Sequence, residues 1–230
     1  NYKEGLKLGD LNRSIIQIKQ TYILFNSSLI GNITNSCIPF IISSFYSLEN
    51  LGIYNVADRI KNIAIQIINP LSNSIFPKMS KSYKKDKNLE NKKFINFLIL
   101  ISIIGLMIFT ILNLNCDLFV SYFVKEKVEG LNTILKILSF SFLINIIYEC
   151  FMNQYLIINN LLNEVNKIKL VILFSSISIG IPAIYSQGIY GAALTNLSYE
   201  IIGLIYAINI FINEVPISND SAMTNWPGKA

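Results

Sequence analysis

The sequence has no histidine, few charged side chains and no closely spaced cysteines. The absence of histidine excludes histidine-based catalytic triads, HExxH zinc sites and histidine proton relays. The three cysteines, Cys37, Cys116 and Cys150, are far apart and form no CxxC pair. Neither a zinc site nor a disulfide framework is therefore indicated, and we expect no cofactor or metal.

Charged residues make up only 14% of the 230 residues, whereas a soluble domain has about 25%. Hydrophobic residues make up 52%, and the mean hydropathy is +0.48. This balance predicts an integral membrane protein. The net charge of +5 does not indicate a nucleic-acid partner, because the lysines cluster between apolar runs and no RNA-recognition or zinc-finger motif is present.

Six stretches are long and apolar enough to be read as membrane spans, which need about 20 residues each. They cover residues 21–44, 53–76, 94–114, 134–158, 168–185 and 192–212. The predicted fold class is all-α, a polytopic transmembrane bundle of about six spans. Its domains are a cytoplasmic amphipathic lead-in (1–20), the bundle (21–212) and a polar, disordered tail (213–230). We read residues 116–132 as an amphipathic segment on the outer surface.

The loop "KMSKSYKKDKNLENKK" (78–93) holds seven lysines against two acids. If this loop is cytoplasmic, 14 of the 19 basic residues lie on its side of the bundle and 5 on the other. The 14 include Lys167 and Lys169, which we assign to the turn where the fifth span begins. The positive-inside rule then places both termini in the cytoplasm. The chain begins at Asn1 rather than at methionine, and we expect it to be a piece of a longer protein.

Polar side chains form a stripe along the second predicted span. They recur at spacings of 3, 1, 3, 4, 3 and 4, which at 100° per residue keeps them on one side of a helix. A charge at the bilayer centre costs about 2.5–3.5 kcal/mol, so this stripe should face a bundle interior or water. The stripe consists of Asn55, Asp58, Arg59, Asn62, Gln66, Asn69 and Asn73.

The first span carries a matching polar stripe, and the fourth and sixth spans carry shorter ones. We expect a water-filled face built mainly by the first two spans, and a peripheral place for the nearly apolar span 94–114. The alternative is that small and polar side chains simply hold helices together. The stripes are Thr21, Ser28, Asn32, Asn35, Ser36 and Ser43; Ser141, Asn145, Glu149 and Asn153; and Asn196, Tyr199, Glu200, Gly203 and Tyr206.

Two carboxylates, Glu149 and Glu200, fall in the middle of predicted spans. They could couple transport to a cation gradient, or they could be hydrogen-bonded structural acids. Both interpretations stay open at this point.

The stretch "LGIYNVADRIKNIAIQIINPLSNSIFPKMSK" (51–81) resembles the corresponding hairpin of bacterial O-antigen flippases of the Wzx type. These belong to the multidrug/oligosaccharidyl-lipid/polysaccharide exporter superfamily. The likeness lies in the Leu-Gly-Ile-Tyr start, Ala57 before the basic residues around Arg59, Pro70, and the Phe76-Pro77 end before a serine- and lysine-rich loop. It extends loosely over residues 21–212.

The resemblance implies that this chain is the second of two six-helix lobes around a cavity in the bacterial inner membrane. Such exporters move undecaprenyl-diphosphate-linked sugar units, for example for lipopolysaccharide, to the periplasmic leaflet. The implied partners are this lipid-linked oligosaccharide, membrane lipids, the missing N-terminal lobe, a glycan polymerase and a chain-length regulator.

The resemblance also implies that basic cavity residues meet the pyrophosphate, Arg59 first and Lys61 second. Lys61 lies about 100° from the axis of the stripe. Asparagine and glutamine side chains would bind the sugar hydroxyls. The complete predicted substrate site is Arg59, Asp58, Lys61, Asn62, Gln66, Asn69, Asn32 and Asn35, with Glu149 and Glu200 for ion coupling.

Three other functions are alternatives to this one. A cation-coupled multidrug antiporter of the same superfamily would use Glu149 or Glu200 as its acidic site. A membrane enzyme of sugar-lipid synthesis should carry clustered acids or histidine in a cytoplasmic loop, whereas the loops offer only Asp86, Glu90 and Glu164, so we expect no enzymatic activity. A non-transporting membrane scaffold of glycan assembly would keep its polar stripes closed to water.

Overall fold

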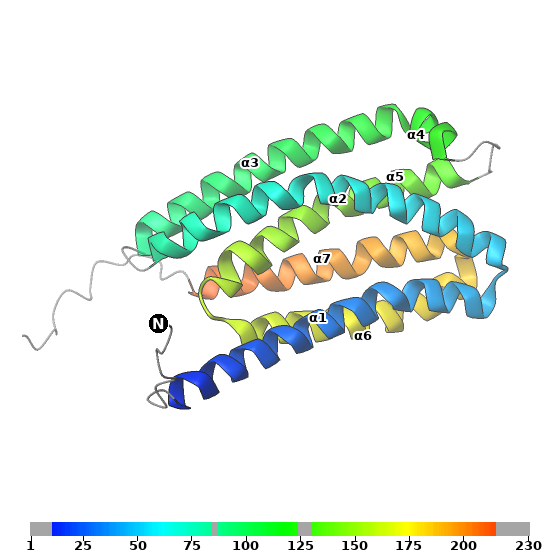
Figure 1. Cartoon of the computed structure of the whole chain (residues 1–230). Coiled ribbons are helices and arrows are strands. Elements are labelled where there is room, and N and C mark those ends of the chain that lie inside the picture. The colour runs from blue at the N-terminus through cyan, green and yellow to red at the C-terminus, as the bar shows by residue number, and fades with distance from the viewer. Residues whose placement is uncertain (1–10, 84–86, 124–129, 215–230) are drawn as a thin grey trace, which may run out of the picture.

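The computed structural model describes residues 11–83, 87–123 and 130–214, and almost all of these residues are helical. The predicted all-α class is confirmed. In chain order the helices are α1 (Leu11–Phe45), α2 (Leu48–Tyr83), α3 (Lys87–Leu114), α4 (Cys116–Phe123), α5 (Leu131–Cys150), the π-helix η1 (Phe151–Ile157), α6 (Leu162–Gln187) and α7 (Ile189–Glu214). Since η1 continues α5, six long helical rods lie side by side in Figure 1.

Four of these rods are long and apolar enough to cross a membrane, within the part of the chain that the structure describes. They are residues 91–114 of α3, the combined α5 and η1, α6, and residues 189–213 of α7. The rods α1 and α2 are longer still, at 35 and 36 residues, but they carry the polar stripes predicted for the first two spans. The bundle therefore combines four apolar spans with two long amphipathic helices.

Several predicted boundaries differ from the observed ones. The predicted lead-in (1–20) and first span have no break between them at residue 20. α1 begins at Leu11 and continues through residue 20, because no glycine or proline interrupts the chain between Leu11 and Ile30. In the predicted amphipathic segment 116–132, residues Cys116–Phe123 form α4, and α5 already begins at Leu131. Residues 124–129 lie outside the described chain. Most of the predicted tail, residues 215–230, is also outside it.

α3 packs on α5 and α6 packs on α7, as sequential hairpins would, whereas α1 and α2 contact each other little. α7 packs between α5 and α6, α1 packs chiefly on α6, and α2 packs chiefly on α5. α3 lies on the outside against α5 and α2, as expected for the most apolar span. Because α1 and α2 each follow a different partner, they contact one another much less than α6 and α7 do.

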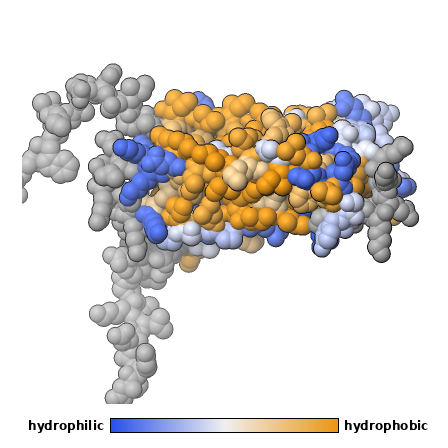
Figure 2. Space-filling model, turned by 90° about the horizontal axis from the view of Figure 1, so that it is seen from above, coloured by the Kyte–Doolittle hydropathy of each residue, from blue (hydrophilic) through white to orange (hydrophobic). Residues whose placement is uncertain are grey.

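The outer surface carries a broad apolar belt. Figure 2 shows an orange band over the middle of the bundle and blue groups at both ends. On α3, this belt includes the exposed side chains of Ile99, Ile103 and Met107. The N-terminal end of α1 and the C-terminal end of α7 lie at the same end of the bundle (Figure 1). This arrangement agrees with an even number of membrane crossings.

α6 and α7 approach each other closely where glycine leaves out a side chain. A Cβ atom added at Gly191 would lie 2.0 Å from the carbonyl oxygen of Ala183. At the turn between the two helices, Gly188 adopts φ +61°, a left-handed conformation that glycine tolerates best. Small residues at such contacts let membrane helices pack backbone to backbone.

We predict that Gly191→Ala destabilises the bundle by about 1–3 kcal/mol, because the added methyl group meets backbone that cannot move aside. The matched control is Gly52→Ala on α2, where no heavy atom lies within 4 Å of the added Cβ. Thermal unfolding of the protein in detergent measures both. Equal melting temperatures for the two variants would contradict the close α6–α7 contact.

Candidate functional site

A polar cavity of about 530 Å³ opens where α1 and α2 separate. Five rods contribute to its wall, and α1 and α2 supply 10 of the 18 lining residues, in agreement with a face built mainly by the first two spans. The lining includes seven asparagines, four charged side chains and only two aliphatic ones, Ile65 and Ile172. The seven asparagines are Asn32 and Asn35 from α1, Asn62, Asn69 and Asn73 from α2, and Asn145 and Asn153 from α5 and η1.

Seven of the ten predicted site residues line this cavity: Asn32, Asn35, Lys61, Asn62, Asn69, Glu149 and Glu200. Asp58 lines an adjoining chamber of about 90 Å³, which shares Lys61 and Asn62 with the main cavity. Arg59 and Gln66 are exposed and do not belong to the lining of either space. The order expected for the two basic residues is therefore reversed in the geometry, because Lys61 faces the cavity and Arg59 does not.

Lys61 is a buried cation held by two helices. Its Nζ atom lies 3.0 Å from Asp58 Oδ1, 3.1 Å from Asn196 Oδ1 and 3.9 Å from Glu200 Oε1. The residue is only 4% exposed. The 100° offset from the polar stripe thus turns Lys61 toward α7 rather than toward lipid. An ammonium in such a place is stable only when it is paired and hydrogen-bonded.

Asn196 on α7 is the centre of this buried network. Its Oδ1 atom accepts hydrogen bonds from Lys61 and from Ser141 Oγ at 2.6 Å. Its Nδ2 group donates to the hydroxyls of Tyr54 at 3.4 Å and Tyr199 at 3.0 Å. Both ends of the amide are used, and the network joins α2, α5 and α7.

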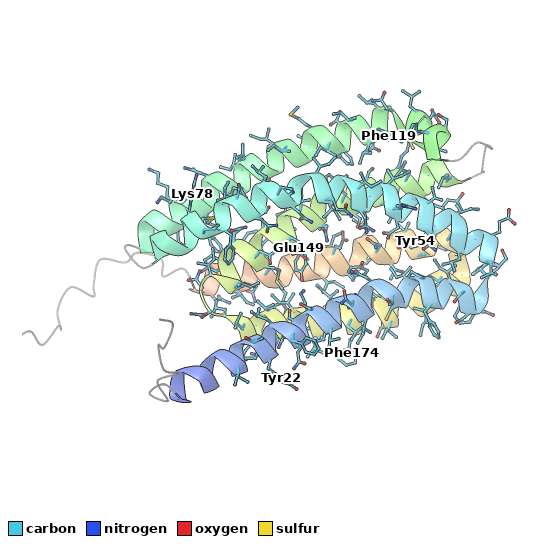
Figure 3. The ribbon with its side chains drawn as sticks, viewed as in Figure 1. Tyr22, Tyr54, Lys78, Phe119, Glu149 and Phe174 are labelled. Carbon is cyan, nitrogen blue, oxygen red and sulfur yellow. The ribbon has the colours of Figure 1, made fainter. Side chains whose placement is uncertain are left out.

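Glu149 and Asn153 form the part of the wall where α5 becomes the π-helix η1. Asn153 Nδ2 donates to Glu149 Oε2 at 2.8 Å, and both residues line the cavity. Figure 3 shows Glu149 within the bundle, whereas Tyr22 and Phe174 point outward from it. On another side of η1, Gln154 donates to the backbone carbonyl of Ser72 on α2 at 3.0 Å. Short π-helical segments inside α-helices are frequent at functional sites.

Lys169 is a cavity residue that the sequence reading missed. It was assigned to a turn, but α6 already begins at Leu162, so Lys169 lies two turns inside the helix and lines the cavity. Gly31 of α1 faces it, since a Cβ added there would lie 3.5 Å from Lys169 Nζ. No ion pair of Lys169 occurs with any residue of the described chain, whereas its neighbour Lys167 pairs with Glu164 at 2.6 Å.

An apolar belt around an amide-lined cavity defines this chain as a polytopic helical membrane protein with a polar interior site. Residues 18–127 match the family described as "Polysaccharide biosynthesis protein". The chain is also 29% identical over 201 residues to the "Capsular polysaccharide biosynthesis protein CapF" of Staphylococcus aureus. The aligned region covers 84% of this chain and 50% of that relative, so the chain spans about half the length of the relative. No solved structure matches it.

Both matches are to polysaccharide biosynthesis proteins, in agreement with the resemblance seen in residues 51–81. The family match covers most of α1 and all of α2, α3 and α4, and so it includes most of the two helices that lie on either side of the cavity opening.

We predict that Lys61→Met lowers the free energy of unfolding by about 3 kcal/mol, because it leaves Asp58 without its cation inside the bundle. Arg59→Met is the matched control, since Arg59 is exposed on the same helix and should change stability by less than about 0.5 kcal/mol. Unfolding of the two variants in detergent, followed by circular dichroism, measures the difference. A larger loss for Arg59→Met would contradict the assignment of Lys61 as the buried cation.

Proposed function

We propose that the protein containing this chain is a flippase. It moves undecaprenyl-diphosphate-linked oligosaccharide repeat units across the bacterial inner membrane for surface polysaccharide synthesis. The observation that carries the proposal is the amide-rich cavity inside an apolar helical bundle. The similarity to polysaccharide biosynthesis proteins supports it.

Asparagine side chains suit a sugar cargo. Each amide offers two hydrogen-bond donors and an acceptor, which match the hydroxyl groups of a sugar without adding charge. Seven such amides, on α1, α2 and the α5–η1 rod, line the cavity and give many alternative pairings. Weak, interchangeable hydrogen bonds are what a transporter needs, because the cargo must leave as readily as it enters.

Lys169 is the cavity cation best suited to a phosphate. The charge of Lys61 is already balanced by Asp58 at 3.0 Å, and that ammonium is also hydrogen-bonded to Asn196. Lys169 has no carboxylate partner within the described residues and lies on the opposite, α6 side of the cavity. An ammonium beside a phosphate forms charge-assisted hydrogen bonds, which are stronger than neutral ones.

The proposed mechanism needs no covalent chemistry. The sugar headgroup would enter the cavity from the cytoplasmic side, while the isoprenoid tail stays in the bilayer. The part of the protein outside this chain would supply the other cavity wall, and rocking of the two halves would expose the cargo to the far side. A scaffold without transport activity would instead leave the cavity closed to cargo throughout.

A drug/cation antiporter is the second candidate, because Glu149 and Glu200 both line the cavity. The bonding of Glu200 to Ser141 and Asn145 within the bundle makes it a poorer direct contact for a cationic drug. Drug efflux that depends on Glu149, together with normal surface polysaccharide in a deletion strain, would favour the antiporter over the flippase.

We predict that Lys169→Ala lowers surface polysaccharide roughly tenfold or more at unchanged protein level. A charge-assisted hydrogen bond contributes about 1.5–3 kcal/mol, and about 1.4 kcal/mol corresponds to a factor of ten. The matched control is Lys167→Ala, which removes a lysine of the same helix that is exposed and paired with Glu164. Immunoblotting of cell-surface polysaccharide measures both. Normal polysaccharide in the Lys169→Ala strain would contradict this function for the cavity.

A further inference from the structure

Ser141 is placed between two hydrogen-bond acceptors. Its Oγ atom lies 2.6 Å from Asn196 Oδ1, and it is also hydrogen-bonded to Glu200 Oε2. A serine hydroxyl carries one hydrogen, so it can donate to only one of them. If Glu200 were ionised, the other contact would bring two oxygen lone pairs together inside the bundle.

The orientation of the Asn196 amide does not remove this conflict. Turning the amide over would place its NH₂ group against the ammonium of Lys61, 3.1 Å away, and an ammonium can only donate. The amide oxygen must therefore face Lys61, and the same oxygen is the one next to Ser141. The hydrogen missing from the network has to come from Glu200.

We infer that Glu200 is a reversible proton-binding site, and that this arrangement is its protonated form. The carboxyl Oε2–H donates to Ser141, Ser141 donates to Asn196, and Glu200 Oε1 accepts from Asn145 at 3.4 Å. Every contact then has one donor and one acceptor. Lys61 pairs with Asp58 at 3.0 Å and stays 3.9 Å from Glu200, as expected when only Asp58 is charged.

Charge counting gives the same answer. With Glu200 protonated, the cluster of Asp58, Lys61 and Glu200 carries one negative and one positive charge and is neutral. With Glu200 ionised, the cluster would carry a net charge of −1 while Glu200 and Lys61 are 3% and 4% exposed. An unbalanced charge at such a depth is costly.

The site can exchange its proton because Glu200 also lines the cavity. On deprotonation one proton leaves to cavity water, and the Ser141 hydroxyl turns to donate to the new carboxylate. The Lys61 ammonium then moves toward Glu200, while Asp58 keeps its hydrogen bond from Asn62 at 2.8 Å. Other titratable groups near the site or on the cavity wall are Tyr54 on α2, Tyr148 and Glu149 on α5, Lys169 on α6 and Tyr199 on α7; α1 contributes only uncharged side chains.

The consequence for transport rests on the proposed function. Protonation removes one negative charge from the wall that shares the cavity with Lys169, which favours entry of an anionic phosphate group. Loss of the proton restores that charge and favours release of the cargo. Glu200 would thus link proton binding to the affinity of the cavity for anionic cargo.

The test is infrared spectroscopy of the full-length protein in lipid nanodiscs, since a protonated carboxyl absorbs separately from a carboxylate. The spectrum of the wild type minus that of Glu200→Gln should contain one protonated-carboxyl band near neutral pH, and this band should disappear at alkaline pH. Glutamine preserves the bonds to Ser141 and Asn145, so the variant should fold. Glu164→Gln, at an exposed ion pair, is the matched control. This variant retains the Glu200 carboxyl, so the spectrum of the wild type minus that of Glu164→Gln should lack the protonated-carboxyl band.

A Glu200→Asp variant retains a carboxyl and should show the band at a displaced frequency, so the assignment does not depend on the glutamine variant alone. Absence of the band at every pH at which the protein is folded overturns the inference, and so does a band that persists at all pH values. Because the signal needs no cargo, its absence leaves the proposed function standing. Normal export by Lys169→Ala overturns that function and leaves the signal intact.

Discussion

The structure depends on how it accommodates a positive charge inside a membrane bundle. Lys61 is almost fully buried, and its ammonium takes partners from its own helix and from α7, namely Asp58, Asn196 and, further away, Glu200. These contacts tie α2 to the α5–α7 part of the bundle. α1 has no comparable tie to α2 and follows α6 instead. The cavity is the space left between two helices that are held to different neighbours.

Much of the fold could be predicted from the sequence, because apolar runs of about 20 residues have few alternatives to helices in a membrane protein. The helix ends were less accessible. α1 begins at Leu11, with no glycine or proline before Ile30 to interrupt it. α2 continues to Tyr83 although Pro77 directly follows the predicted end of the span. Lys78 and Lys81 follow the apolar part of α2 but still belong to this helix. The positions of the lysines therefore indicate where the membrane ends, but not where the helix ends.

The site was predictable where one helix face decides it, as for Asn62 and Asn69, which line the cavity as the stripe indicated. It was not predictable where a neighbouring helix decides. Arg59 was ranked above Lys61 because Arg59 belongs to the stripe. In the structure Lys61 is buried against Asn196 and Glu200 of α7, whereas Arg59 is exposed. Lys169 was counted as a loop charge because its distance from the helix start depends on where α6 begins, at Leu162.

The central claim is that the asparagine face of α2 looks into water while the opposite face meets lipid. The direct measurement is labelling of single cysteines by a membrane-impermeant thiol reagent, in the full-length protein with Cys37, Cys116 and Cys150 replaced by serine. Cysteine at Asn62 or Asn69 should react fast, and cysteine at Ile63 or Ile67, both exposed on the apolar side, should react slowly. Equal labelling of all four, or faster labelling at the isoleucine positions, would contradict the account.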